Sequence, residues 1–109
     1  MTQQTFFLKL NDTSPALLYY LLPKTVDLTG ATVQFSMKAA PGGAIKINKA
    51  AAVVVTPTGN PAVRYDWQAA NSDTEGEFDA EFLVTYASGK KETFPNSEFI
   101  KVIVGQRAA

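Results

Sequence analysis

The chain has 109 residues, of which 46% are hydrophobic, 11% aromatic and 18% charged, so it is long enough for one small globular domain and too short for two. It contains no histidine and no cysteine, which excludes a Ser-His-Asp triad, a thiol nucleophile, a zinc site of imidazole or thiolate ligands, and a disulfide. Ten basic and ten acidic residues give a formal net charge of zero, which argues against nucleic acid as a main partner because binding its backbone depends on excess positive charge.

Alternation of apolar and polar residues predicts strands from the start of the chain. Between Gln4 and Leu10, the residues Phe6, Leu8 and Leu10 lie on one side of a predicted strand, and turn-forming residues follow. The next run, residues 16–22, is apolar on both faces and ends at Pro23. A buried strand and a short helix both fit this run, and its seven residues between two prolines favour the strand.

The middle of the chain continues this pattern. Residues 32–38 alternate cleanly after a turn at 27–30, and residues 62–68 alternate after a dense turn signal at 57–61. In the segment 45–56, alanines could extend a helix but the consecutive valines oppose one, so we expect an interrupted strand. The positions predicted to face inward here are Val33, Phe35, Met37, Val63, Tyr65 and Trp67.

The last third holds the longest period-two pattern, at residues 77–86, after a polar turn at 71–76. A hairpin connection at 88–91, a short strand at 92–94 and a last strand at 99–104 follow, with a frayed tail at 105–109. We therefore expect one domain spanning residues 1–109, with a core at 4–104. Its predicted fold is an all-β, immunoglobulin-like antiparallel β-sandwich of seven or eight strands; a small barrel is the alternative.

The segment from Asp73 to Ala80 resembles the turn that leads into a core strand of immunoglobulin-like domains. Phe78 stands at the aromatic position, so the hydroxyl of a tyrosine corner is missing, and Ala80 stands where a disulfide cysteine would be. On physical grounds, Asp73 can accept hydrogen bonds from turn amides, Gly76 permits an unusual backbone angle, and Phe78 buries the start of the strand.

Two features suggest chemistry but have simpler explanations. Acidic residues stand at every second position from Asp73 to Glu81, which could hold calcium or act as acid and base. Neighbours on one strand face lie nearly 7 Å apart, so a solvated face paired with lysines such as Lys90, Lys91 or Lys101 fits better.

Aromatic residues could form a sugar-binding platform, although core packing explains most of them; they are Tyr19, Tyr20, Tyr65, Trp67 and Tyr86.

Several segments, taken in order, resemble the N-terminal domain of baseplate upper proteins of tailed phages and related small phage structural proteins. The shared features are a leucine-threonine-glycine turn opening a strand, an aspartate-glycine-aromatic approach to another strand, a hairpin ending in phenylalanine-proline, and a hydrophobic last strand. They stand at Asp27–Phe35, Asp73–Phe82, Gly89–Pro95 and Phe99–Val104, with Val63–Trp67 between the first two. The resemblance covers residues 26–104.

This resemblance implies a non-enzymatic bacteriophage virion protein, an assembly subunit of the tail, baseplate, connector or capsid surface. It implies other virion proteins and further copies of itself as partners, with no nucleic acid, membrane or cofactor, and it transfers no functional residue. In the baseplate proteins further segments follow this domain, whereas the sequence here ends at Ala109, so we expect a freestanding subunit. A carbohydrate- or cell-surface-binding module, with a host-surface glycan as its ligand, is the alternative.

Interaction contacts are expected at apolar strand positions, and the candidates are Phe6, Leu8, Tyr19 and Tyr20. Tyr19 and Tyr20 are adjacent, so they point to opposite faces of a strand and one of them leaves the core unless both faces are covered. We predict no catalytic, cofactor-binding or metal-binding residue. The start of the chain lacks the features of a signal peptide, and the longest apolar run is too short to span a bilayer, so we expect synthesis in the host cytoplasm and localisation in the virion.

Overall fold

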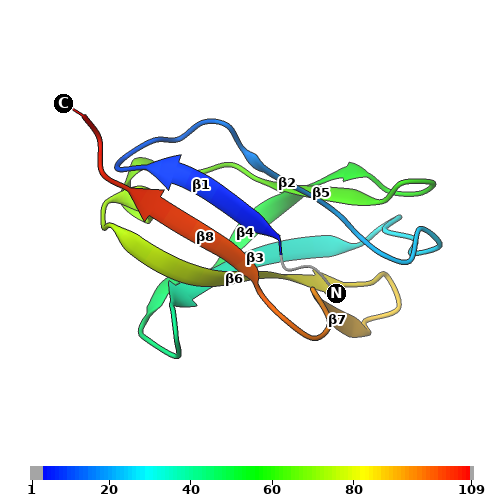
Figure 1. The fold of residues 1–109 in the computed structure, drawn as a ribbon. Helices are drawn as coiled ribbons and strands as arrows, with labels where there is room; N and C mark the ends of the chain where they lie inside the picture. The colour runs from blue at the N-terminus through cyan, green and yellow to red at the C-terminus, as the bar shows by residue number, and fades with distance from the viewer. Residues whose placement is uncertain (1–3, 109) are drawn as a thin grey trace.

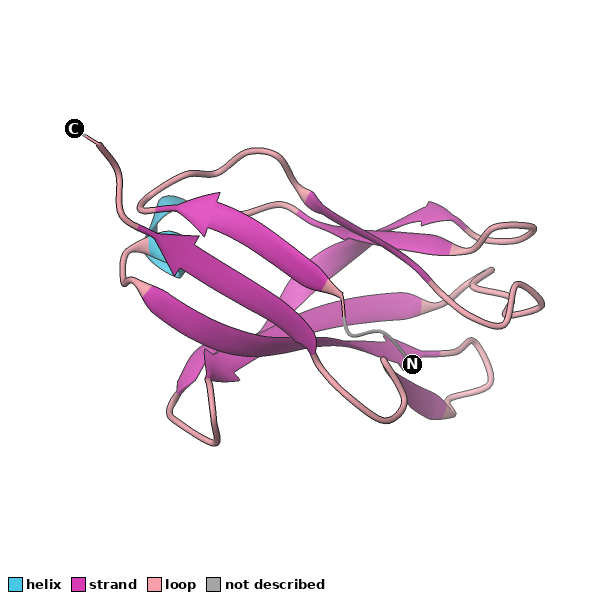
Figure 2. Ribbon diagram, viewed as in Figure 1, coloured by secondary structure: helices cyan, strands magenta, loops and turns pink. Residues whose placement is uncertain are grey.

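The computed structural model describes residues 4–108 and contains eight strands and one short 3₁₀ helix in that range, which confirms the all-β prediction (Figures 1 and 2). The strands are β1 (Thr5–Lys9), β2 (Leu17–Tyr20), β3 (Thr32–Ala39), β4 (Ile45–Thr56), β5 (Ala62–Tyr65), β6 (Gly76–Thr85), β7 (Lys91–Phe94) and β8 (Ile100–Gly105). The helix, η1 (Ala69–Ser72), lies between β5 and β6.

The strands form one continuous sheet that folds over on itself. Its order is β1-β8-β6-β3-β4-β5-β2. The strand β7 lies outside this order: β8 pairs with the first half of β6, and β7 pairs with the second half of β6 on the same side. The long strand β4 makes the fold-over, because its first part pairs with β3 and its last part with β5. Layer A therefore contains β1, β8, β6, β7, β3 and the first part of β4, and layer B contains the rest of β4, β5 and β2 (Figure 1).

This topology has the strand neighbours of an immunoglobulin-like sandwich. The adjacent strands β3, β6 and β8 correspond to strands C, F and G of that fold, and the pair β2 and β5 corresponds to B and E in the opposite layer. One pair departs from the antiparallel arrangement expected from the sequence, because β1 runs parallel to β8. Within residues 4–108, the sheet has open edges at β1, at β2, at β7 and along the first part of β4, which pairs only with β3.

The core lies between the two layers and is centred on Phe35 of β3, which is completely buried. Its ring stacks on Tyr65 with centroids 4.3 Å apart and contacts Phe82 at 5.0 Å and Trp67 at 5.6 Å. These rings come from three strands and the residues just after β5, so they join both layers. Most positions on the predicted inward faces are buried: Leu8, Val33, Phe35, Met37, Val63, Tyr65, Trp67, Phe78, Ala80, Phe82, Val84, Ile100, Val102 and Val104. Phe6, Leu10 and Tyr86, which share those predicted faces, are only partly buried.

The interruption expected in the segment 45–56 is a local irregularity in a strand that continues through it. The pairing of β4 with β3 shifts between Phe35–Ala50 and Met37–Ile47. At this point Lys49 has a positive φ of 52°, and its backbone N–H donates to the hydroxyl of Ser36 at 3.0 Å. The alanines therefore lie in a strand, because the pairings on both sides hold the backbone extended.

The segment between β5 and β6 is more ordered than the predicted polar turn. It contains η1, whose end is tied to the first loop by the hydroxyl of Ser72, which donates to the carbonyl of Asp12 at 2.9 Å. Gly76 then opens β6 with φ of 141°, a backbone angle that residues with a Cβ adopt only under strain. The expected role of Gly76 is thus confirmed, and Phe78 is buried as expected.

The end of the chain is also better anchored than the predicted tail. Gly105 is the last residue of β8. A guanidinium nitrogen of Arg107, Nη1, lies 3.4 Å from the carbonyl oxygen of Leu10 and 3.6 Å from a carboxylate oxygen of Asp12. These contacts tie the residues after β8 to the loop that follows β1. Ala109 lies outside the described residues.

Candidate interaction surface

On β1, the two residues chosen from the sequence as interaction candidates face the interior. Leu8 is only 5% exposed and belongs to the core, so its choice as a surface contact is corrected here. Phe6 is half-buried and stacks on Trp67 with ring centroids 5.8 Å apart. The exposed apolar side chain of β1 is Phe7, because neighbouring residues of a strand point to opposite faces.

On β2, the two tyrosines separate as expected for adjacent strand residues. Tyr19 points inward and stacks on Phe82 at 5.9 Å, and its partial burial, followed by the negative charge of Glu98, raises its pKa. Tyr20 points outward and is 56% exposed. The double-sided apolar run is therefore an edge strand with one covered face and one open face, and not a strand buried on both sides.

The outer surface of layer B carries a group of exposed apolar side chains, which we call the β2–β5–β4 face. In the strand register, Leu18 of β2 lies opposite Arg64 of β5, and Arg64 lies opposite Val53 of β4. Tyr20 lies opposite Ala62 in the next row. The face is defined by four residues that are each more than 40% exposed: Leu18, Tyr20, Val53 and Val55.

Leu22 extends this face beyond the end of β2. It is 67% exposed and lies beside Tyr20 at a surface hollow that Lys24 and Asn60 also line. The sequence signal for the β4 part of the face is the run Val53-Val54-Val55, in which the two outer valines are more exposed than the central one. Sequence reasoning identified the strand but not the face that it would expose.

Charge on the β2–β5–β4 face is locally neutralised. Arg64 is the only charged residue in β2, in β5 and in the segment 53–56. Its guanidinium binds the carboxylate of Asp66 through two hydrogen bonds, Nε to Oδ1 at 2.9 Å and Nη2 to Oδ2 at 3.2 Å. A neutral apolar face of this kind is typical of a surface that contacts another protein.

The outer surface of layer A combines a row of charged residues with two exposed apolar side chains, Phe7 of β1 and Ile45 of β4. Lys38 of β3, Asp79 of β6 and Lys101 of β8 lie opposite one another in register. The Lys101 ammonium is 3.6 Å from the carboxylate of Asp79 and 4.0 Å from that of Glu77. Part of the acidic stretch is therefore a charged strand face with a cross-strand lysine, as the alternation suggested.

The start of the acidic stretch is held differently. Asp73 accepts a hydrogen bond from Lys46 of β4 and another from the hydroxyl of Thr74, and these bonds lower the pKa of its carboxyl group. In residues 4–108, no group of three or more acidic side chains is placed to hold a metal ion. Within this range, the described acidic residues Asp73, Glu77 and Asp79 therefore form ion pairs and do not form a cluster of metal ligands.

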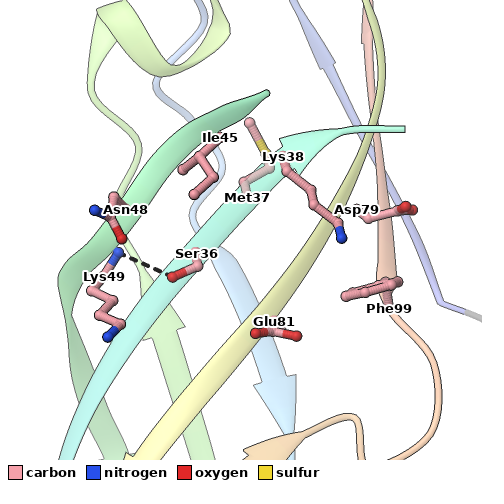
Figure 3. Close-up of a pocket in the computed structure, with 9 residues that line it drawn as sticks. All are labelled: Ser36, Met37, Lys38, Ile45, Asn48, Lys49, Asp79, Glu81 and Phe99. Atoms are coloured by element: carbon pink, nitrogen blue, oxygen red, sulfur yellow. Dashed lines mark hydrogen bonds between the residues drawn. The ribbon is translucent and has the colours of Figure 1, made fainter. Parts of the chain in front are cut away.

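A hollow of about 290 Å³ lies on the outer surface of layer A (Figure 3). Lys38 extends across it toward Asp79 and Phe99, and its ammonium lies 5.0 Å from the centre of the Phe99 ring. Ile45 and Lys49 line the β4 side of the hollow. The volume is at the lower limit for ligand pockets, about 300 Å³, and Asp79 already pairs with Lys101.

The aromatic residues considered for sugar binding do not form an exposed platform. Tyr65 and Trp67 are buried, and burial, followed by the charge of Asp66, raises the pKa of Tyr65. The hydroxyl of Tyr86 donates to Glu92 at 2.7 Å; desolvation, followed by this bond, raises its pKa to about 12. Of the five aromatic residues considered, Tyr20 alone is largely exposed.

In the part of the chain that the structure describes, no helix is long and apolar enough to cross a membrane. Comparison with known proteins finds no match among family models, curated proteins or solved structures. The candidate site is therefore identified from the structure alone, and we take the β2–β5–β4 face as that candidate because four of its side chains are exposed and apolar.

Proposed function

We propose that this protein is a non-enzymatic structural subunit of a bacteriophage virion and that it works by binding other protein surfaces. The observation that carries the binding role is the β2–β5–β4 face, where Leu18, Tyr20, Val53 and Val55 are exposed together. Exposed apolar side chains gathered on one face favour association, because their burial removes apolar surface from water. The virion setting is supported by the ordered sequence resemblance across residues 26–104.

The proposed partners are other virion proteins and further copies of the chain, and the proposed location is the tail, baseplate, connector or capsid surface. The neutral net charge fits association with protein surfaces better than with nucleic acid. A sugar-binding role has less support, since flat sugar rings are held by exposed aromatic rings and most of the candidate rings are packed inside or against neighbours.

Purified particles of the phage that encodes this chain provide the test. Mass spectrometry of those particles should detect the chain, and a phage carrying Val53→Lys should incorporate less of it. The matched control is Asp79→Asn on the outer surface of layer A, which should be incorporated normally. Absence of the chain from wild-type particles would refute the virion assignment, and normal incorporation of Val53→Lys would refute the role of the face.

A further inference from the structure

The outer edge of β2 has backbone groups that no described strand pairs. The N–H of Leu21 donates to the carbonyl of Pro61 at 2.8 Å, in the same register as the pairs from Leu17–Tyr65 to Tyr20–Ala62. Bonded and non-bonded pairs alternate along an antiparallel pair, so the bonds to β5 come from the odd-numbered residues. The N–H and C=O groups of Leu18 and Tyr20 therefore point to the open edge.

This edge lacks the features that normally prevent strands from pairing. Residues 13–23 contain no charged side chain, whereas charges, lysine above all, block most exposed edges. The other open edges of the described sheet carry such charges, with Lys9 in β1, Lys91 in β7 and Lys46 and Lys49 in the first part of β4. Prolines stand only outside the strand, at Pro15 and Pro23, and so they limit the length of a pairing without preventing it.

We propose that two copies of this chain pair through their β2 strands, antiparallel and about a two-fold axis at Tyr19. The segment between the two prolines, residues 16–22, is symmetric about Tyr19. In this register, Leu18 of each copy lies opposite Tyr20 of the other, and each of these two pairs exchanges two backbone hydrogen bonds. The two copies of layer B then form one sheet of six strands.

Charge favours this arrangement over a parallel one. The nearest charged residues on the two sides of the segment are Asp12 and Lys24. Asp12 already lies 3.6 Å from Arg107 of its own chain, so the charge that decides the direction is Lys24. Antiparallel pairing places the two Lys24 residues at opposite ends of the joined strands, whereas parallel pairing would bring them together. The chain is neutral overall and Arg64 is already paired with Asp66, so no uncompensated repulsion opposes a second copy.

The size of the edge sets the strength of the dimer. A standard interface buries roughly 800 Å² per partner, which is about one eighth of the 6302 Å² surface of this chain. Seven residues of strand are about 24 Å long and supply part of that area. We therefore expect that the fraction of dimer depends on protein concentration. In this dimer the two β2–β5–β4 faces lie side by side. A role of the dimer in a virion rests on the proposed function.

A single introduced cysteine tests the register, because the chain has no cysteine of its own. In the proposed dimer the two Tyr19 positions form a non-bonded pair with Cα atoms about 4.5 Å apart, within the range that a disulfide spans. Tyr19→Cys should therefore form a covalent dimer under mild oxidation. Tyr20→Cys is the control and should cross-link at least about tenfold more slowly, since each Tyr20 faces Leu18 instead. Equal cross-linking of the two variants would overturn the register.

Proline substitutions test the edge itself. Leu18→Pro removes an N–H that points to the open edge and leaves the bonds to β5 intact, which edge strands tolerate. Analytical ultracentrifugation should show a wild-type dimer and at least about tenfold weaker association for Leu18→Pro, with circular dichroism confirming that it folds. Phe7→Pro, the same change at the β1 edge, should dimerise like wild type. A wild-type monomer at about 1 mM, or unchanged dimerisation of Leu18→Pro, would overturn the proposal.

These outcomes separate the dimer from the proposed function. If wild type stays monomeric while Val53→Lys still lowers incorporation into particles, the dimer fails and the binding role of the face stands. If the dimer forms but wild-type particles lack the chain, the virion role fails and the β2 pairing stands.

Discussion

The outer surfaces of the two layers are built from the same alternating pattern but differ in what they present to water. On layer A, Lys38, Asp79 and Lys101 form a charged row across three strands. On layer B, the corresponding row is Leu18, Arg64 and Val53. Sheets with one solvated side normally show polar residues there. The charged row of layer A is solvated in the usual way, although Phe7 and Ile45 are also exposed on that layer. The apolar row of layer B is the feature on which the proposed binding role rests.

Both surfaces depend on one core, and the largest expected effect comes from removing a ring at its centre. Phe82 is fully buried, stacks on Tyr19 and packs at a tilted angle against Phe35. Phe82→Ala should lower the free energy of unfolding by about 3–5 kcal/mol, as measured by urea denaturation. Leu83→Ala, at the next and less buried position of β6, is the control. A loss under about 1 kcal/mol for Phe82→Ala would mean that the two layers do not share this core.

The charged row of layer A should contribute much less. Lys101→Ala removes the ion pairs with Glu77 and Asp79, in which the side chains of Lys101 and Asp79 are only 23% and 13% exposed. We expect a loss of about 0.5–1 kcal/mol in the free energy of unfolding, reduced by added salt. A loss as large as that of Phe82→Ala would contradict the view that this surface mainly serves solvation.

Alkaline pH should weaken the hydrogen bond that the hydroxyl of Tyr86, just after β6, donates to Glu92 of β7. The pKa of Tyr86 is raised from 10.0 to about 12 in the folded protein, so the folded state holds this proton more tightly than the unfolded state. Its contribution to stability is complete below pH 10 and is lost as the pH rises through 12. Tyr86→Phe should therefore reduce the fall in stability between pH 10 and 12 in thermal melts. Tyr19 and Tyr65 also have raised pKa values, so part of the fall should remain.

The smallest effect on stability is expected on the β2–β5–β4 face. Val53→Lys changes an exposed side chain and should alter the free energy of unfolding by no more than about 0.5 kcal/mol. It should, however, lower the binding of a hydrophobic dye and reduce light scattering at high concentration, because the apolar patch is interrupted. Substitution of Asp79 by Asn on layer A should leave dye binding unchanged. Equal dye binding by wild type and Val53→Lys would show that the patch is not accessible.

Much of the fold could be predicted because strict alternation specifies both a strand and its buried face. This held for β3, β6 and β8, whose inward residues are buried as expected. Alternation contains no information about strand partners, so the parallel pair of β1 and β8 could not be foreseen. The helix η1 was also missed, because its four residues are too few to show a helical period. Asn71 caps it locally on the N–H of Gln68, and Ser72 ties its end to Asp12.

The candidate site was less predictable, for a related reason. An apolar residue on a strand fits both a core and an interface, and only the three-dimensional layers decide between them. The opposite directions of Tyr19 and Tyr20 followed from their adjacency, whereas the burial of Leu8 depends on the layer opposite β1. The exposure of Val53 and Val55 depends on β4 leaving β3 to join layer B, which no local pattern encodes.

The position of Trp67 gives the protein an internal optical reporter. Trp67 is the single tryptophan of the chain; it is 3% exposed and its ring lies against Phe6 of β1 and Phe35 of β3. Within residues 4–108, its indole N–H is buried without a hydrogen-bond acceptor, so its surroundings are unusually apolar. Detachment of β1 alone would therefore shift its fluorescence emission to longer wavelength, which makes loosening of the first strand visible without any added label.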